Sequence, residues 1–264
     1  MSVVKSASQA ALEEPLPPEY RWNALAFGAD SALFTIGMSF VSITAVLPSL
    51  VVLLTPSELA VGIVSGLAGG AWLLPQLLVA SAVARMPRKK PIVAIYAWIG
   101  RLTFLGTAAA IYWLAEPSPR LALGILLASL LVFYVIDAVV SVPWFDLLAK
   151  AIPPRRRGRV LGTAQVLGGL GGIAAGVFVR FALGADSPWP YPANYAILFV
   201  SAAVVLLAAA GALTCIREPL SEVASGSMPS LKAVLALLPR ILTRDRAFRR
   251  LVFVRLATGF VGMA

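Results

Sequence analysis

Long apolar segments alternate with short polar ones along almost the whole chain. A helix needs about 20 apolar residues to cross the roughly 30 Å of hydrocarbon in a bilayer. Six segments reach that length, and a seventh apolar segment begins near residue 248. The pattern therefore predicts an all-α, polytopic membrane helical bundle. The six segments are 24–50, 58–80, 91–115, 121–148, 159–184 and 193–216.

The composition agrees with a bilayer environment. Hydrophobic residues make up 59% of the 264 residues, and charged residues only 13%. A soluble domain of this size could not cover so much apolar surface with its polar residues. We therefore expect the bilayer to be the solvent for most of the chain.

The distribution of basic residues predicts the orientation of the segments. The chain has 22 lysine and arginine residues and a formal net charge of +10. Eighteen of these residues lie in the amino-terminal tail or in the connections after the second, fourth and sixth segments. The positive-inside rule makes the amino terminus and these connections cytoplasmic, which predicts a multi-pass protein of the cell (plasma) membrane. Nucleic acid is not an expected partner, because the charges are split among short loops without an aromatic platform.

Polar segments divide the chain into four regions. Residues 1–22 are expected to be a disordered cytoplasmic tail, and residues 23–216 the six-helix transmembrane bundle. Residues 217–247 are expected to be a cytoplasmic linker with an amphipathic helix, which either lies on anionic membrane lipid or packs on the protein. Residues 248–264 match the truncated start of a seventh transmembrane helix, so we expect a partial chain.

The residue inventory excludes several kinds of chemistry. Histidine is absent and Cys215 is the only cysteine, so a disulfide framework, a Cys/His metal site and a histidine base are all excluded. The glycine-rich stretch of the fifth segment lacks the Lys-Ser/Thr of a phosphate-binding loop. We therefore expect neither an enzyme nor a bound cofactor.

Glycine recurs at every fourth position in two of the segments. Lipid tails give helices no hydrophobic reason to associate, so smooth stripes that let backbones approach closely are a main source of packing energy. These stripes predict helix packing, and such low-relief faces would also let helices slide or rock in a transporter. The glycines are Gly62, Gly66 and Gly70 in the second segment and Gly168, Gly172 and Gly176 in the fifth.

Three ionisable residues lie at membrane depth. Each costs at least about 2.5 kcal/mol at the centre of a helix unless it is paired or hydrated. Arg101 and Asp137 are expected at nearly the same depth, so an ion pair between them is geometrically allowed. That pair would be either a fixed bridge between two segments or part of a substrate or proton site.

Asp30 has no obvious partner at its depth in the first segment. It is therefore the leading candidate for a protonatable or substrate-facing group, and the alternative is a neutral carboxyl group in a polar helix contact. Gln76 and Gln165 add amide donors and acceptors at span depth. Together with Arg101 and Asp137, these residues form the predicted substrate or proton pathway.

The order of these features resembles a known family. The chain contains "ARMPRKK" between the second and third segments, "PWFDLLAKAIPPRRRGRVLG" from the fourth to the fifth, "GGLGGIAAG" in the fifth and "IREP" after the sixth. This order is similar to the amino-terminal half of a bacterial major facilitator superfamily (MFS) transporter. The resemblance implies two six-helix bundles that rock about a site at the membrane midplane, with a carboxy-terminal half missing here.

The resemblance also implies a cytoplasmic gate. Arg85, Arg88 and Lys89 match basic positions of the family's signature loop, whereas Ala84 stands where the family has an acidic residue. Asp146, at the inner end of the fourth segment, resembles the acidic residue with which such loops pair. We expect Arg85 to be its partner in a gate that closes the cytoplasmic side.

These features favour a secondary transporter of a small molecule, coupled to protons or another gradient if Asp30 titrates. A non-transporting membrane scaffold or sensor, with static buried charges, is the alternative. A membrane-embedded enzyme acting on lipid is the weakest hypothesis, because the sequence shows no histidine, metal cluster or convergent carboxylate pair.

Overall fold

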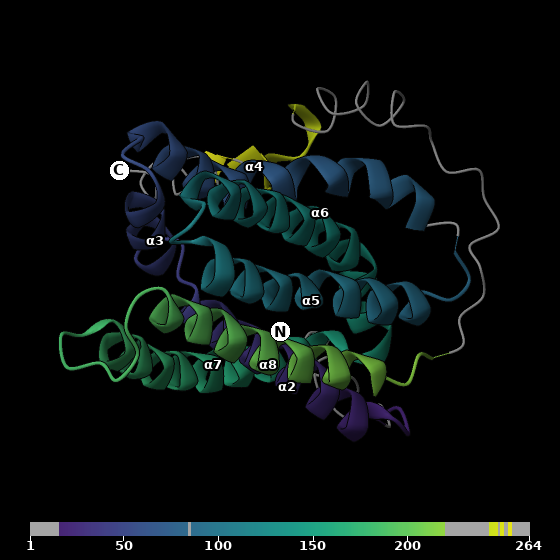
Figure 1. Ribbon diagram of the computed structural model, residues 1–264. Coiled ribbons are helices and arrows are strands. Elements are labelled where there is room, and N and C mark those ends of the chain that lie inside the picture. The colour runs from purple at the N-terminus through teal and green to yellow at the C-terminus, as the bar shows by residue number, and fades with distance from the viewer. Residues whose placement is uncertain (1–15, 84–85, 220–242, 248, 251–252, 255–264) are drawn as a thin grey trace.

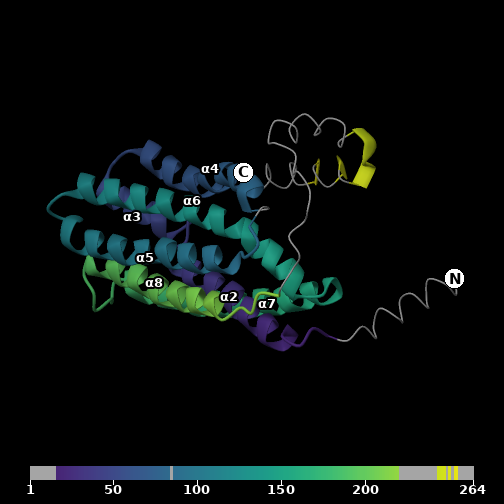
Figure 2. The same cartoon turned by 90° about the vertical axis from the view of Figure 1, so that its right-hand side faces the viewer.

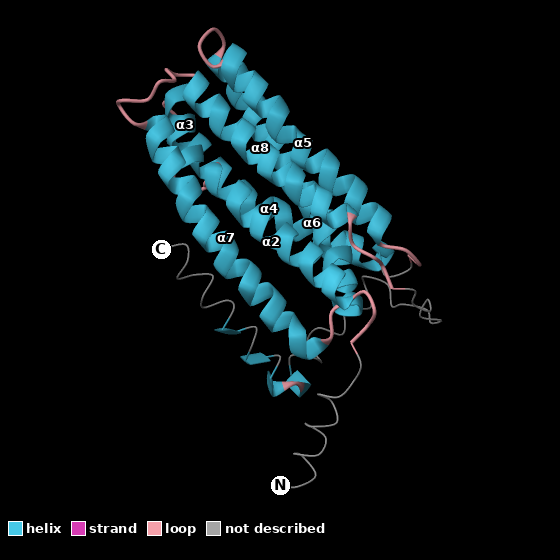
Figure 3. Ribbon diagram, turned by 90° about the horizontal axis from the view of Figure 1, so that it is seen from below, coloured by secondary structure: helices cyan, strands magenta, loops and turns pink. Residues whose placement is uncertain are grey.

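The computed structural model describes residues 16–83, 86–219, 243–247, 249–250 and 253–254 (Figure 1). The described residues form helices and connecting turns without a β-strand (Figure 3). The helices are α2 (Tyr20–Phe40), α3 (Val46–Leu54), α4 (Glu58–Val83), α5 (Lys90–Leu114), α6 (Pro119–Ala151), α7 (Pro154–Leu183) and α8 (Ala193–Thr214).

The all-α membrane prediction is confirmed at this level. Four helices, α5 to α8, are long and apolar enough to cross a membrane. Large apolar side chains on α7, such as Leu170 and Ile173, are 61% and 68% exposed, which suits a face that contacts lipid. The amphipathic helix predicted in the linker and the predicted seventh helix fall largely outside the described residues.

The first apolar segment is not one helix, so the prediction of a single span over 24–50 is wrong. Helix α2 ends at Phe40, and α3 begins at Val46. Pro48 explains the break, because a proline ring clashes with the carbonyl group four residues earlier and cannot continue a helix through Thr44. The hydroxyl groups of Ser42 and Thr44 bond each other at 3.1 Å within the break.

The six long helices form two groups of three in chain order, α2, α4 and α5 followed by α6, α7 and α8, and their main contacts join helices of different groups (Figures 1 and 2). Helix α5 packs on both α6 and α8, α2 packs on both α7 and α8, and α4 packs on α6. Exchanging α2 with α6, α4 with α7 and α5 with α8 reproduces this set of main contacts. Each group has three long helices joined end to end, so the second group runs in the opposite direction along the bundle.

The apolar core of the described residues forms two clusters. One includes Phe104, Phe133 and Leu206, and the other includes Phe27 and Ala97. The clusters occupy successive stretches of the same helices, since α5 contributes Ala97 to one and Phe104 to the other. The core is therefore divided into two layers along the bundle axis.

Glycine brings α7 close to α2. A Cβ atom added at Gly168 would lie 2.9 Å from Cβ of Thr35 and 3.3 Å from the carbonyl oxygen of Ala32. At Gly172 it would lie 2.9 Å from the Ser39 hydroxyl oxygen. At Gly176 it would meet nothing within 4 Å. The α2–α7 contact therefore depends on the first two glycines of the predicted stripe.

The glycine stripe of α4 has no such contact in the described structure. A Cβ atom at Gly62 or Gly66 would meet nothing within 4 Å. The side-chain surroundings of Gly70 lie outside the described residues. Helix packing through the α4 stripe therefore stays a prediction.

Gly168→Val should destabilise the bundle, whereas Gly176→Val on the same helix should not. Overpacking a close helix contact costs about 1–3 kcal/mol, and the carbonyl oxygen beside Gly168 belongs to the backbone and cannot rotate away. Thermal unfolding of the purified protein in detergent measures the difference. Equal melting temperatures for the two variants would contradict the close α2–α7 contact.

Candidate functional site

A buried ion pair joins α2 to α5. Nη2 of Arg101 lies 2.8 Å from Oδ1 of Asp30, and the two side chains are only 5% and 7% exposed. The expectation that Asp30 has no partner is therefore wrong. Arg101, whose depth allowed an ion pair with Asp137, makes its described ion pair with Asp30.

The error came from the start of the first helix. Helix α2 begins at Tyr20, before the apolar pattern does. Asp30 is therefore about 15 Å along α2, and Arg101 about 17 Å along α5, at a rise of 1.5 Å per residue. Both helices start at the same end of the bundle, so these depths match.

Two further helices contact the ion pair. The indole Nε1 of Trp144 in α6 donates a hydrogen bond to Oδ2 of Asp30 at 2.9 Å. Nη1 of Arg101 donates to the carbonyl oxygen of Leu206 in α8 at 3.2 Å, and the guanidinium lies 5.6 Å from the centroid of the Phe34 ring. We call Asp30, Arg101 and Trp144 the central cluster. It joins residues from α2, α5 and α6 and contacts the backbone of α8.

The sequence analysis did not identify Trp144. Tryptophan usually marks the membrane interface, and Trp144 lies in the same stretch of α6 as the charged residues of its last turns. The sequence offered one indication of its role: Trp144 lies two turns after Asp137, on a helix with other polar residues. Only the structure shows that its indole nitrogen faces a carboxylate.

Asp137 and Arg101 line one small pocket between α5 and α6, together with Tyr96, Gly100 and other residues of these helices. The prediction that both residues lie at similar depth agrees with this pocket. The hydroxyl group of Tyr134, one turn before Asp137, is buried and has no hydrogen-bond partner among the described residues. A buried donor without a partner costs free energy, so this hydroxyl is available to a ligand or a water molecule.

The two predicted glutamines lie in different surroundings. Nε2 of Gln76 in α4 donates to the hydroxyl oxygen of Ser141 in α6 at 3.1 Å, and Ser141 donates to the carbonyl oxygen of Ala138 at 2.8 Å. Gln76 is therefore placed beside the polar face of α6. Gln165 lies on the exposed side of α7, and the structure does not bring it to the central cluster.

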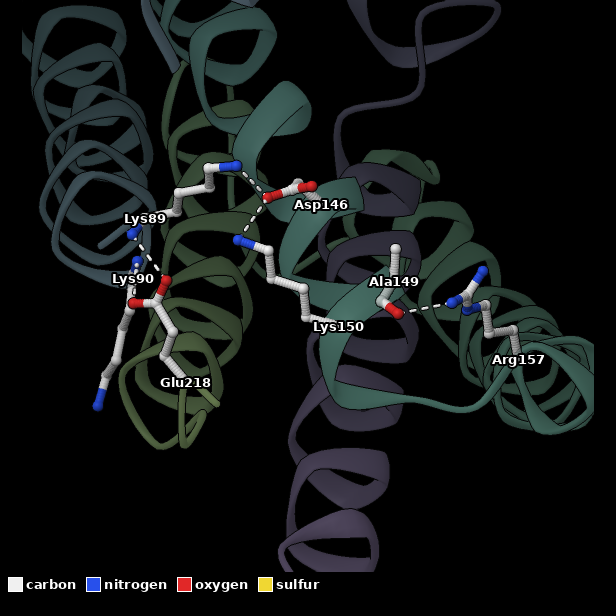
Figure 4. A network of polar contacts seen from close by, with 7 residues as sticks. All are labelled: Lys89, Lys90, Asp146, Ala149, Lys150, Arg157 and Glu218. Atoms are coloured by element: carbon white, nitrogen blue, oxygen red, sulfur yellow. Dashed lines mark hydrogen bonds and ion pairs between the residues drawn. The ribbon is translucent and has the colours of Figure 1, made fainter. Parts of the chain in front are cut away.

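A charged network lies at the end of the bundle where α5 and α7 begin and α6 ends, which we call the basic end (Figure 4). Nζ of Lys89 contacts Oδ2 of Asp146, and Nζ of Lys150 lies 3.1 Å from the same oxygen. The partner that we predicted for Asp146, Arg85, lies outside the described residues. The described partners of Asp146 are therefore two lysines, of which Lys89 belongs to the predicted gate.

Glu218, just after α8, caps the start of α5. Its two carboxylate oxygens accept hydrogen bonds from the backbone N–H groups of Lys89 and Lys90, at 2.9 and 3.1 Å (Figure 4). The first N–H groups of a helix have no partner within the helix, and a carboxylate also interacts favourably with the helix dipole there. Arg88, another predicted gate residue, lines an open pocket with Glu218.

The start of α2 is tied to the same region. Asn23 is 1% exposed and makes two bonds with the backbone of Arg217: its Nδ2 donates at 2.9 Å and its Oδ1 accepts at 2.8 Å. Nη1 of Arg217 lies 2.6 Å from Oε2 of Glu19. The segment "IREP", which contains Arg217 and Glu218, therefore joins α2 to α5 at the basic end. The sequence analysis did not identify Asn23.

Asp30→Asn or Arg101→Gln should each destabilise the protein by about 3–5 kcal/mol, because each leaves the other charge buried without compensation. The double variant should lose much less than the sum of the two. Equilibrium unfolding in detergent micelles measures all three variants. Asp186→Asn and Arg180→Gln, at exposed positions, are matched controls. Additive losses would contradict a coupled pair.

Glu218→Gln should expose the amide groups at the start of α5. Loss of a cap costs about 0.5–2 kcal/mol, so the amide hydrogens of Lys89 and Lys90 should exchange roughly two- to thirtyfold faster. Hydrogen–deuterium exchange of the peptide that covers these residues measures the change. Glu116→Gln, at an exposed position, is the control, and equal exchange in both variants would contradict the cap.

Comparisons with protein-family models, with curated proteins and with solved structures found no match to this chain. Functional inference therefore depends on the chain's own contacts. Two groups of contacts bear on function: the central cluster and the charged network at the basic end.

Proposed function

We propose that this chain is the amino-terminal six-helix half of a major facilitator type secondary transporter, which moves a small molecule across the plasma membrane by alternating access. The observation that carries this proposal is the pairing of two three-helix groups around one buried ion pair. Inverted three-helix repeats within a six-helix half, with a polar site near the midplane, are a recognised transporter architecture.

The polar residues of the bundle centre supply a substrate site in this proposal. The central cluster fixes the positions of α2, α5 and α6. Asp137, Gln76 and the Tyr134 hydroxyl, which has no hydrogen-bond partner among the described residues, lie on or beside α6, where a polar group of a substrate would gain hydrogen bonds. A second six-helix half would supply the opposite wall of the site.

The network at the basic end supplies the gate. Nζ of Lys89 contacts Asp146 and so joins the start of α5 to the end of α6, whereas Lys150 binds the same carboxylate from within α6. If the Lys89–Asp146 contact broke, the start of α5 and the end of α6 could separate, and the proposed substrate site would open at the basic end. The density of basic residues at this end supports a cytoplasmic orientation for it, following the positive-inside rule, and the proposed transporter would then have the start of α2 on the cytoplasmic side.

One observation favours the second candidate, a non-transporting membrane scaffold or sensor. Both carboxylate oxygens of Asp30 have partners, one from Arg101 and one from Trp144. A charge cluster whose carboxylate oxygens both have partners would stabilise one arrangement of the helices and need not move. The two candidates differ in whether residues of the bundle centre change their accessibility.

Asp146→Asn should favour the arrangement that is open at the basic end. In a Cys215→Ser background of the full-length protein in proteoliposomes, a cysteine at Ser141 should react faster from the basic side once the Lys89 contact is weakened. If the substitution shifts the equilibrium between the two arrangements by about 1.4 kcal/mol, the labelling rate should change about tenfold. Asp186→Asn, in the connection that follows α7 at the opposite end of the bundle, is the control.

Reactivity from the opposite side should fall in the same variant, because alternating access requires reciprocal changes. A substrate from a broad uptake panel should change both rates in opposite directions. Unchanged labelling from both sides, together with no uptake, would support the scaffold and reject the transporter. Asp30→Asn tests the proton role: transport with unchanged pH dependence would exclude Asp30 from coupling.

A further inference from the structure

Helices α2 and α7 diverge toward the basic end. They touch where Gly168 approaches Thr35, but a Cβ atom at Gly28, two turns before Thr35, would meet nothing within 4 Å. The gap between the diverging helices is a groove of about 380 Å³. Its walls are mostly small or apolar, and they are formed by Tyr20, Ala24, Leu25, Gly28, Ala29, Ala32, Arg159, Val160, Thr163, Ala164 and Leu167. This volume is within the usual range for small-molecule sites.

Two guanidinium groups lie at the basic end of this groove. Arg159 is part of the groove wall. The guanidinium carbon of Arg156 lies 5.5 Å from the centroid of the Tyr20 ring, which is also part of the wall. Neither arginine has an ion pair within the part of the chain that the structure describes. The mouth of the groove is therefore positively charged.

Among the described residues, the other charged groups near the groove do not compensate the positive charge of Arg156 and Arg159. The groove wall contains no aspartate or glutamate among the residues described. Glu19, next to Tyr20 in sequence, binds Arg217 at 2.6 Å. Arg157 donates hydrogen bonds to the carbonyl oxygens of Ile152 and Ala149, at 2.8 and 2.6 Å. Arg157 thus fixes the turn between α6 and α7, whereas its neighbours Arg156 and Arg159 remain available to an anion.

We propose that this groove binds an anionic phospholipid, with an acyl chain between α2 and α7 and the phosphate group at Arg156 and Arg159. Apolar walls suit a hydrocarbon chain, and guanidinium groups bind phosphate oxygens with charge-assisted, often bidentate hydrogen bonds. Both arginines lie in the first two turns of α7. A helix that crosses the bilayer places such residues at the level of the lipid headgroups, where arginine side chains reach the interface.

The combination of positive charge and apolar walls favours a lipid over the other ligands that could bind this groove. A water-soluble phosphate would gain nothing from the apolar walls. A helix of a second protein half would have to bring its own carboxylates to two arginines. The lipid supplies an anion and an apolar chain in one molecule that surrounds the protein at high concentration. This site does not depend on transport, so it can hold or fail independently of the proposed function.

Native mass spectrometry of the chain in detergent, with added phosphatidylglycerol or phosphatidylcholine of identical acyl chains, tests the charge part of the proposal. The chain should retain phosphatidylglycerol preferentially. Arg156→Gln and Arg159→Gln should each weaken that retention about fivefold, the effect of about 1 kcal/mol for each arginine near a membrane surface. Arg180→Gln, at the opposite end of α7, should leave it unchanged.

Gly28→Val tests the apolar part of the groove. The new side chain has room beside the backbone and would fill the groove, so retention of both lipids should fall while the preference for phosphatidylglycerol persists. Gly62→Val on α4, also with nothing within 4 Å, is the matched control. Circular dichroism of every variant confirms that helix content is kept.

Three results would overturn the proposal. One is equal retention of the two lipids by the unmodified chain. Another is an equal effect of Arg159→Gln and Arg180→Gln. The third is competition by free glycerol phosphate that is as effective as the intact lipid, which would mean that the apolar walls contribute nothing.

Discussion

The ion pair between Asp30 and Arg101 sets the relative positions of the central helices. Charges that leave water need a partner of opposite sign and hydrogen bonds for their remaining atoms, or the cost is several kcal/mol. Here the partners come from different helices: Trp144 supplies the second bond to Asp30, and the Leu206 carbonyl group accepts from Arg101. Sliding any one of these helices by a turn, about 5.4 Å, would break at least one of these contacts. The cluster therefore fixes the register of α2, α5, α6 and α8.

The remaining two long helices are held differently. Helix α4 packs mainly on α6, and α7 mainly on α2, and the exchange that relates the two three-helix groups also relates these two contacts. Neither helix contributes to the central cluster. The α2–α7 contact is made by glycine against short side chains and ends where the helices diverge toward Gly28. The centre is thus held by polar contacts among α2, α5, α6 and α8, whereas α4 and α7 are held mainly by packing against one neighbouring helix each.

The apolar pattern predicted most of the helices well, because burial in a bilayer imposes one requirement on every turn. It failed at residues 41–45, where Pro48 and a local hydroxyl pair interrupt a continuous apolar run. It also placed the start of the first helix too late, since polar residues such as Asn23 occupy the first turns of α2. That small error moved Asp30 to the wrong depth and hid its partner.

Side-chain partners were harder to predict than helices. Depth along a helix restricts which residues can meet, but several residues share each depth, and Arg101 lies near both Asp30 and the pocket of Asp137. Composition gave no sign of Asn23 or Trp144, because the polar partner of each lies more than 100 positions away in the sequence. Contacts of this kind depend on helix packing, which the sequence pattern limits but does not determine.

The basic end connects the bundle to whatever follows it. Asn23 holds the backbone of Arg217 against the start of α2, and the next residue, Glu218, caps α5. The segment after α8 therefore leaves the bundle from a fixed point between two helices. Lys89 takes part in two contacts of this region, through its backbone N–H group to Glu218 and through its Nζ atom to Asp146. A change in the α5–α6 contact would thus reach the segment after α8 through the start of α5, where Lys89 and Lys90 bind Glu218. This is the physical route by which a gate at this end of the proposed transporter would be coupled to the chain that links its two halves.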